Sequence, residues 1–177
     1  MHHVKLALAL ILTLLLAGCS IPSGNRQVLW DWEAAEALRL ALTRAGCPYV
    51  SAAQGPYRFD CSGLVLWAYQ QAYPALRLRD DGGGIVYDAT ADVLWRLNVR
   101  RIDLRSARPG DLVFLSWDAD RVTHVGLFRR WLDGERFELV NASSYLGQVV
   151  SEPWPAAGMN RGMWLVGVGR LETAMGN

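Results

Sequence analysis

Arg58-Phe59-Asp60-Cys61-Ser62-Gly63-Leu64-Val65 is the stretch that decides the fold, because it places a cysteine where a loop turns into an apolar helix. Asp60 occupies an N-cap position, and Leu64, Val65, Ala68 and Ala72 follow at helical spacing. A thiol at a helix N-terminus lies beside unpaired N–H groups and the positive end of the macrodipole, which lower its pKa. Cys61 is therefore the candidate nucleophile, and Gly63 would leave room beside it for a substrate backbone. The alternative is a buried structural cysteine.

His124 is the single histidine outside the N-terminal segment that contains His2 and His3. In Thr123-His124-Val125-Gly126-Leu127-Phe128, strand alternation would point His124, Gly126 and Phe128 to one face and Val125 and Leu127 to the other. A near-neutral pKa suits an imidazole that takes a proton from a thiol and passes it to a leaving amine. A single histidine on a strand is more often an ordinary polar residue than a catalytic one. Because His124 is the one imidazole available to a thiol at a helix N-terminus, a catalytic Cys-His pair is favoured here.

A third group is expected to hold the imidazole in its useful tautomer. Asn141 is the best candidate, because it ends the apolar run Phe137-Glu138-Leu139-Val140 that follows the histidine strand. The alternative is an asparagine that only turns the chain, and Asn98 and Asp133 are rival orienting residues.

The N-terminal segment has the pattern of an export signal. Lys5 precedes the apolar run from Leu6 to Leu16, which is too short to span a bilayer. The run ends in Leu16-Ala17-Gly18-Cys19, which resembles a bacterial lipobox, so residues 1–18 are predicted to be a signal peptide and Cys19 to be lipidated. An ordinary secretory signal or an uncleaved anchor are the alternatives. Ser20 after the cysteine favours the outer membrane, facing the periplasm.

Cleavage before Cys19 would leave about 159 residues, enough for a single domain. Residues 19–29 are expected to be a lipid-anchored linker, and residues 30–177 the folded domain. Without Lys5 the chain has 17 basic residues, all arginine, and 17 acidic residues, so its formal charge is zero with histidine neutral. This balance gives no indication of a nucleic-acid partner.

Cys47 and Cys61 are the remaining cysteines of a domain expected in a disulfide-permissive compartment. They could pair, but a bridge would remove the nucleophile, so Cys47 is better interpreted as a small core residue. One histidine and two separated cysteines do not make a zinc-ligand pattern. The sequence thus predicts no metal and no cofactor.

Helices come first along the chain and strands later. Asp31 is expected to cap a helix that ends before Gly46 and Pro48, and a second helix runs from Cys61 to Tyr73-Pro74. A third, short helix is expected over residues 89–97. After a turn at residues 108–110, apolar runs predict strands over residues 112–115, 122–128, 137–140, 148–151 and 165–171. This order indicates an α+β fold with an antiparallel sheet of about five strands.

These residues together resemble the NlpC family of papain-like cell-wall cysteine peptidases, over roughly residues 34–170. The matching segments are Gly46-Cys47-Pro48-Tyr49, Phe59-Asp60-Cys61-Ser62-Gly63-Leu64-Val65, Arg108-Pro109-Gly110-Asp111-Leu112-Val113-Phe114, His124-Val125-Gly126, Val140-Asn141-Ala142-Ser143-Ser144 and Gly147-Gln148-Val149-Val150. The resemblance implies a papain-like fold in which N-terminal helices carry the nucleophile and pack on the sheet. It makes Cys61 the nucleophile, His124 the base and Asn141 the orienting residue. Tyr49 would border the oxyanion site, and Asp60 and Ser62 would recognise the amino end of the substrate.

The same resemblance implies a peptidase that hydrolyses peptidoglycan stem peptides at the γ-bond from D-glutamate to the diamino acid. With the lipobox-like segment before Cys19, the protein is expected to be lipid-anchored, and it is expected to be monomeric. The alternatives are an acyltransferase or amidase on the same Cys-His fold, or a catalytically idle wall-binding lipoprotein. The family usually continues from the tyrosine into Trp-Gly-Gly, whereas Tyr49 is followed here by Val50-Ser51-Ala52, so the shape of the cleft does not follow from the resemblance. Most of the tryptophans are expected to be ordinary core or surface-cover aromatics, although any could line the cleft: Trp67, Trp95, Trp117, Trp131, Trp154 and Trp164.

Overall fold

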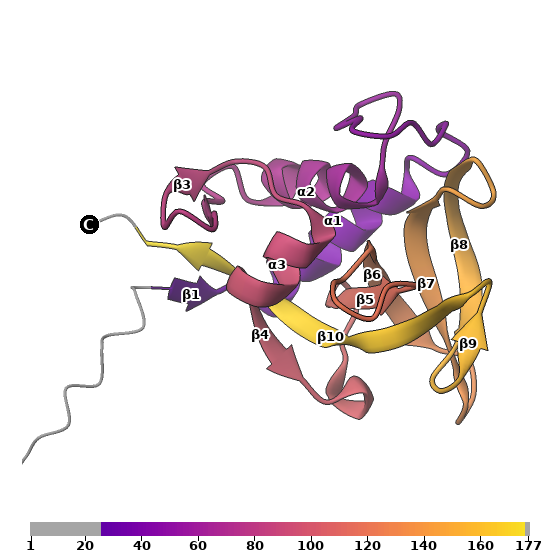
Figure 1. The fold of residues 1–177 in the computed structure, drawn as a ribbon. Helices are drawn as coiled ribbons and strands as arrows, with labels where there is room; N and C mark the ends of the chain where they lie inside the picture. The colour runs from indigo at the N-terminus through magenta and orange to yellow at the C-terminus, as the bar shows by residue number, and fades with distance from the viewer. Residues whose placement is uncertain (1–25, 176–177) are drawn as a thin grey trace, which may run out of the picture.

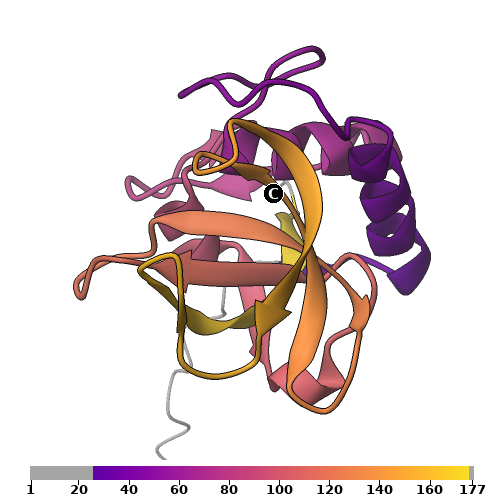
Figure 2. The same ribbon diagram turned by 90° about the vertical axis from the view of Figure 1, so that its right-hand side faces the viewer.

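Three helices pack on one face of a strongly curved antiparallel sheet in the computed structural model, which describes residues 26–175 (Figures 1 and 2). The predicted signal peptide and Cys19 lie outside the described residues. The helices are α1 (Asp31–Leu42), α2 (Cys61–Ala72) and α3 (Ala91–Leu97). Within residues 26–175 no helix is both long enough and apolar enough to cross a bilayer.

The start of α1 differs by one residue from the prediction. Trp30 is the N-cap and Asp31 is the first helical residue, because the Glu33 carboxylate accepts the backbone N–H of Trp30 at 2.8 Å. The carboxylate of Asp31 instead pairs with Arg108. The helix ends at Leu42, and the chain turns away at Gly46 with a φ of +84°, a conformation that favours glycine.

The main sheet has the strand order β1-β10-β5-β6-β7-β8, with β4 and β9 paired to β10, so that it contains eight strands of the described chain. Its members are β1 (Arg26–Val28), β4 (Val99–Ile102), β5 (Leu112–Ser116), β6 (His124–Trp131), β7 (Arg136–Ser143), β8 (Gln148–Pro155), β9 (Met159–Asn160) and β10 (Met163–Ala174). A separate hairpin is formed by β2 (Leu78–Arg79) and β3 (Ile85–Val86), and a short 3₁₀ helix spans Leu104–Ser106.

The predicted α+β, papain-like class is confirmed, and each of the five predicted strands is present. The count of about five was too low, because β1, β4 and β9 have only two to four residues and show no clear alternation. The predicted linker was also too long. Residues 26–28 pair with β10 as β1, and Leu29 is buried, so the folded domain begins before residue 30.

The two faces of the sheet bury separate apolar clusters. Val125 and Leu127 face the helices, together with side chains of α1 and α2, whereas Phe128 points to the opposite face with Phe137 and Trp154. This is the alternation that the sequence predicted for β6. The sheet curves around the cluster that contains Phe128, so the helices pack on its other face, where Val125 and Leu127 lie. On that face α2 lies across β6 and β7. The packing therefore brings the start of α2 to the start of β6.

Candidate active site

Cys61 is the first residue of α2, as predicted, and its side chain is half-buried. The Asp60 carboxylate caps the helix by accepting the backbone N–H of Gly63 at 2.6 Å and the Ser62 hydroxyl at 3.2 Å. Because the first N–H groups of a helix have no intrahelical acceptor, the amides of Cys61 and Ser62 are left beside the thiol. Both amides lie close enough to the thiol to lower its pKa.

Gly63 does not act as the sequence suggested. A Cβ at this position would lie 2.2 Å from the carbonyl oxygen of Ala53, so the glycine makes room for the protein's own loop rather than for a substrate. That loop is fixed by the hydrogen bond from the Asp60 N–H to the same carbonyl, at 2.8 Å. Gly63 therefore holds the residues before the cysteine tightly against α2.

His124 is the first residue of β6, and its side chain is buried. Its Nε2 lies 2.9 Å from Oδ1 of Asn141 on the neighbouring strand β7. Gly126 permits this approach, because a Cβ there would lie 2.9 Å from the Cβ of Asn141. The backbone N–H of Val125, the next residue after His124, lies close enough to the Cys61 thiol to lower its pKa. The structure therefore brings Cys61, His124 and Asn141 together.

Glu152 on β8 is a further member that the sequence did not indicate. Nδ2 of Asn141 donates to its Oε1 at 3.0 Å, and Arg161 pairs with its other oxygen at 2.5 Å. Glu152 is buried despite its charge, and nothing in the sequence distinguishes it from an exposed strand glutamate. Only the β7–β8 register, which sets Asn141 opposite Val150 and Leu139 opposite Glu152, brings it into the site.

His124, Asn141 and Glu152 form a buried polar line that fixes one tautomer of the imidazole. Since a carboxylate only accepts, Asn141 must turn its NH₂ group to Glu152 and its carbonyl oxygen to His124. Nε2 of His124 must then carry the proton, which leaves Nδ1 with a free lone pair. An imidazole in this state can take a proton from a thiol.

The pKa of Cys61 departs from the prediction. The pKa of this thiol is raised to about 11, mainly by burial and also by the negative charge of Asp60, whereas the backbone N–H groups of Val125, Ser62 and Cys61 lower it by a smaller amount. The helix N-terminus therefore does not outweigh desolvation. Burial also lowers the pKa of His124, against smaller opposing contributions from Asn141, Glu152 and Asp60. Both groups are neutral at pH 7 by these effects, so a thiolate forms only as its proton moves.

Tyr49 lies beside the nucleophile, as the resemblance implied. Burial raises the pKa of its phenol, and the nearby Cys61 and Asp60 raise it further. The tyrosine is held by the sheet, because its N–H donates to the carbonyl of Gly147 at 2.8 Å. The Cys47 carbonyl likewise accepts the N–H of Val149 at 2.8 Å. Both Cys47 and Cys61 are free thiols.

The rival orienting residues lie elsewhere. The Asn98 side chain is buried against β2, where it exchanges hydrogen bonds with the backbone of Arg79 at 2.8 and 3.0 Å. Asp133 closes the β6–β7 hairpin, accepting backbone N–H groups of Glu135 and Arg136. Neither contacts His124. In residues 26–175 no group of three or more histidine, cysteine or acidic side chains is arranged to hold a metal ion.

A cleft opens at Cys61 between the start of α2, the start of α3 and the loop before β6. It is lined by Asp60, Ser62, Thr90, Asp92, Trp117 and Arg121, besides the cysteine itself. Trp117 is 55% exposed, whereas Trp154 is buried in the second apolar cluster. Of the tryptophans that could line the cleft, Trp117 is the one that does so in the described chain. Trp95 and Trp164 line a neighbouring hollow.

Comparison with known proteins places this arrangement in a family. The profile of the NlpC/P60 family matches residues 46–164, which contain Cys61, His124, Asn141 and Glu152. A protein of Mycobacterium tuberculosis named "probable endopeptidase" is 33% identical over 91 residues, which cover 51% of this chain and 20% of that protein. The bifunctional muramidase/DL-endopeptidase CwlT of Bacillus subtilis is 32% identical over 94 residues, covering 51% of this chain and 25% of that protein.

Among solved structures, NlpC1 from Trichomonas vaginalis superposes with a TM-score of 0.58 and 26% identity, covering 84% of this chain and 47% of that one. The chain spans only about a fifth of the length of the first curated relatives that it matches. The likeness is therefore to one part of those longer proteins.

Proposed function

The chain belongs to the NlpC/P60 family, and on that premise we propose that it is a cysteine peptidase that hydrolyses the stem peptides of peptidoglycan. The observation that carries the proposal is the buried polar line, which leaves Nδ1 of His124 unprotonated. The next residue, Val125, has its backbone N–H close enough to the Cys61 thiol to lower the pKa of that thiol. A scaffold protein would have no use for this arrangement. The comparisons support hydrolysis, since relatives are named as endopeptidases.

In the proposed reaction, Nδ1 of His124 takes the thiol proton while the sulfur of Cys61 attacks the carbonyl carbon. The oxyanion that forms is stabilised by the backbone N–H groups of Cys61 and Ser62, with Tyr49 at its border. His124 then gives the proton to the departing amine, the C–N bond breaks, and a thioester remains on Cys61. A water molecule, deprotonated by His124, hydrolyses that thioester and regenerates the thiol.

The bond that we propose is the γ-linkage from D-glutamate to the following diamino acid. A relative named as a DL-endopeptidase supports this choice. Asp60 and Ser62 line the cleft on either side of Cys61 in the sequence, and we assign to them the amino end of the stem, at L-alanine. The carboxylate of Asp60 suits the N–H donors of that end, and the γ-carbonyl would lie a few atoms further on, at Cys61.

Digestion of purified peptidoglycan with the domain, followed by mass spectrometry of the products, tests the proposal. Cleavage at the proposed bond yields a disaccharide that carries L-Ala-D-Glu, together with peptides that begin at the diamino acid. Fragments cut at the muramyl amide or at the cross-links would contradict the bond, and turnover of non-wall acyl substrates alone would favour the acyltransferase alternative.

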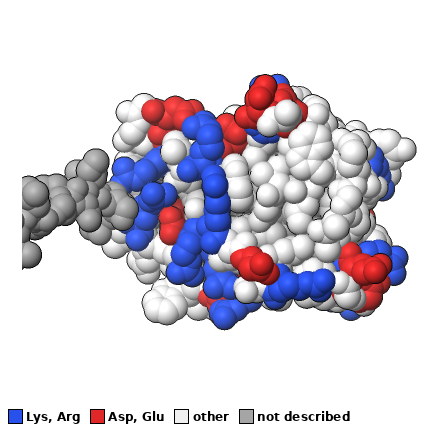
Figure 3. Space-filling model, turned by 60° about the horizontal axis from the view of Figure 1, so that its bottom comes forward, with Lys and Arg blue, Asp and Glu red and all other residues white. Residues whose placement is uncertain are grey.

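We also propose that the protein is anchored in the cell envelope through lipid on Cys19, in the outer membrane and facing the periplasm. Support comes from the surface beside the point where the described chain begins. Arginine side chains gather there (Figure 3), and Trp30 and Trp32 are 64% and 63% exposed next to Arg100, Arg108 and Arg170. Tryptophan and arginine together suit the headgroup region of a membrane. The cleft at Cys61 shares no lining residue with this surface, so it would be left free to face the wall.

Membrane fractionation of cells expressing the full chain tests the anchor. Cys19→Ser is expected to release the protein from membranes or to stall its processing. Unchanged membrane attachment of that variant would point instead to an uncleaved apolar segment.

A further inference from the structure

Arg161 lies beyond the Glu152 end of the buried polar line, in the two-residue turn between β9 and β10. Arg161 and Gly162 both have a positive φ, of +50° and +78°, and Asn160 pairs with Met163 across the turn. Such turns favour asparagine at the first of the two positions, because longer side chains are strained in the left-handed region. Arginine is therefore an unfavourable turn residue here, and the contacts of its side chain have to hold it in place.

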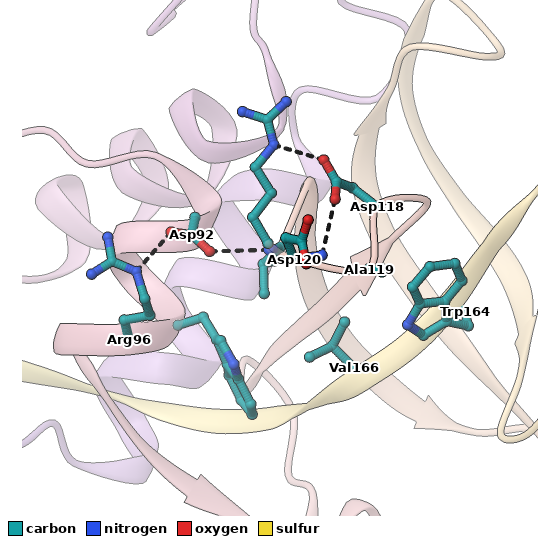
Figure 4. Close-up of a pocket in the computed structure, with 10 residues that line it drawn as sticks. Asp92, Arg96, Asp118, Ala119, Asp120, Trp164 and Val166 are labelled. Carbon is teal, nitrogen blue, oxygen red and sulfur yellow. Dashed lines mark hydrogen bonds and ion pairs between the residues drawn. The ribbon is translucent and has the colours of Figure 1, made fainter.

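The Arg161 side chain makes two contacts. Its guanidinium pairs with Oε2 of Glu152 at 2.5 Å, and its Cζ lies 4.7 Å from the centre of the Tyr145 ring in the turn between β7 and β8. The two paired side chains are 25% and 8% exposed. By comparison, Arg96 and Asp92 at the rim of the neighbouring hollow pair at 2.7 Å with 41% and 26% exposed (Figure 4). Because solvent screens the Arg161 pair less, the charge of Arg161 acts more strongly on Glu152.

The ionised state of Glu152 depends on this arginine. Within residues 26–175, Arg161 is the one positively charged side chain that pairs with Glu152. From the neighbouring strands the carboxylate faces the Asn141 amide on β7 and, behind it, the neutral imidazole of His124 on β6. Asp60 adds a negative charge on the other side of that imidazole. Without Arg161, Glu152 would be a buried negative charge with no compensating positive one, and binding a proton would remove that cost.

A protonated Glu152 would no longer fix the orientation of Asn141. A carboxylate only accepts hydrogen bonds, so the amide must present its NH₂ group to Glu152, but a carboxylic acid also donates and can bind the amide oxygen instead. The reversed amide would donate its N–H to Nε2 of His124. That nitrogen must then accept, so the ring proton moves to Nδ1. In this tautomer the nitrogen that takes the thiol proton has no free lone pair.

We propose that Arg161 is a positioning residue: it keeps Glu152 ionised, and the ionised carboxylate keeps the proton of His124 on Nε2. Arg161 contacts none of the reacting groups and acts through Glu152 and Asn141. Its effect on catalysis rests on the proposed function, in which Nδ1 of His124 takes the thiol proton. Its effect on the position of the ring proton is independent of that function and is measured without substrate.

Nitrogen-15 NMR of the imidazole tests the proton position directly, because protonated and unprotonated ring nitrogens differ widely in chemical shift. The signals of His124 are assigned by their absence from His124→Gln. The test variant is Arg161→Asn, which carries the residue that the turn favours but has a side chain too short to reach Glu152. Wild type is expected to keep the proton on Nε2 between pH 7 and pH 9. Arg161→Asn is expected to show a large fraction on Nδ1 at pH 7 that decreases towards pH 9. A proton that stays on Nε2 in this variant at pH 7 would overturn the proposal.

Kinetics measure the consequence for catalysis. Arg161→Asn should reduce kcat by about tenfold at pH 7 and by less at pH 9, while KM for the stem peptide changes little. Arg161→Lys keeps the positive charge and should restore most of kcat. In Arg161→Asn combined with Glu152→Gln no carboxylate is left to bind a proton, so its decrease in kcat should be the same at both pH values. Arg130→Asn breaks the exposed pair with Glu138 on the same sheet and is the matched control, with a wild-type pH profile expected.

The two measurements separate this inference from the proposed function. A decrease in kcat that is the same at pH 7 and pH 9 for Arg161→Asn would show that Arg161 acts only on the fold, and would overturn the positioning role. If wild type hydrolyses no stem peptide, the proposed function fails, and the NMR measurement alone decides the role of Arg161. Circular dichroism and thermal melting establish that each variant is folded. If Arg161→Asn does not fold, the NMR comparison is made with Arg161→Gln, which also removes the charge.

Discussion

The buried polar line from His124 to Glu152 and the open groove from Asp60 to Trp164 meet at Cys61 but are built in opposite ways. The line consists of strand residues that are all less than 8% exposed, and each side chain has one hydrogen-bonding arrangement available. The groove, which runs from Asp60 past Cys61 to Trp164, consists of helix ends, loops and part of β10, and most of its side chains are half-buried or exposed. Proton transfer thus takes place where the protein supplies every hydrogen-bond partner, whereas recognition takes place where solvent and substrate can exchange.

The largest expected effects come from removing the two reacting groups, Cys61 and His124. Cys61→Ala and His124→Ala should each reduce kcat by on the order of 10⁴-fold or more, because the two residues act as a unit. Stem-peptide hydrolysis followed by chromatography measures the loss. Cys47→Ala removes the other thiol of the described chain and should retain activity. Substantial turnover by folded Cys61→Ala protein would exclude this cysteine as the nucleophile.

Changes further along the line should have smaller effects. Asn141→Ala removes the acceptor of the Nε2 proton and should reduce kcat on the order of 10- to 100-fold, while KM changes little. Glu152→Gln keeps an acceptor for Asn141 but loses the pairing with Arg161, so a decrease of about two- to tenfold is expected. Steady-state kinetics should show a larger decrease in kcat for Asn141→Ala than for Glu152→Gln. If Asn141→Ala is kinetically silent, the imidazole is oriented by another group.

The pH dependence tests whether the line keeps the pair neutral. Catalysis needs unprotonated His124, whose pKa burial lowers below its usual 6.5, so kcat/KM should fall only below that pH. On the alkaline side it should stay level well above neutrality, since the pKa of Cys61 is raised to about 11. An alkaline decline near pH 8 would indicate a preformed thiolate–imidazolium pair instead.

The burial of His124 also makes the stability of the fold depend on pH in the acidic range. In the unfolded chain His124 binds a proton below about pH 6.5, whereas in the folded chain its pKa is lower. The contribution of His124 to the free energy of unfolding is therefore fully present above about pH 6.5. It decreases as the pH falls from there through the lowered pKa of the folded state. The difference in melting temperature between the wild type and His124→Gln should therefore become smaller as the pH is lowered from 7.5 to 5.

The smallest effect is expected from a change at Asp60, which should alter substrate binding rather than the chemical step. Asp60→Asn keeps an oxygen for the Gly63 N–H and so preserves the helix cap, but removes the negative charge at the amino end. We expect KM for stem peptides with a free L-alanine amine to rise about tenfold, since a charge-assisted contact is lost. Muramyl-linked stems, which have no charged amine there, should be affected less. A similar loss of kcat on both substrates would instead implicate Asp60 in the chemistry.

The sequence predicted the line better than the groove, for a physical reason. Cys61 and His124 are the first residues of a strongly patterned helix and strand, and Asn141 follows the apolar run of β7, so local periodicity places them. Glu152 was missed because its role depends on the register between β7 and β8, which the alternation of one strand does not specify. The pKa of Cys61 was predicted in the wrong direction, because the extent of its burial depends on how the loop before β6 packs on α2.

The groove depends on contacts that are distant in the sequence. Trp164 on β10 meets Asp92 on α3 and the loop before β6 only after the sheet has formed. A tryptophan in an apolar strand is ordinarily a core residue, so the pattern gave no reason to separate Trp164 from Trp154. Short strands such as β4 and β9, which complete the sheet around β10, were missed for the same reason.

The central claim is that Cys61 forms a thioester with the D-glutamyl γ-carbonyl of a wall stem, and the acyl-enzyme itself is the most direct object to measure. Wild-type protein is mixed with a defined disaccharide muropeptide, quenched in acid within the first turnover, and examined by intact-protein and peptide mass spectrometry. The account predicts an adduct on Cys61 with the mass of the disaccharide–L-Ala–D-Glu acyl group, absent from Cys61→Ala. An adduct on another residue, or one that contains the diamino acid, would contradict it.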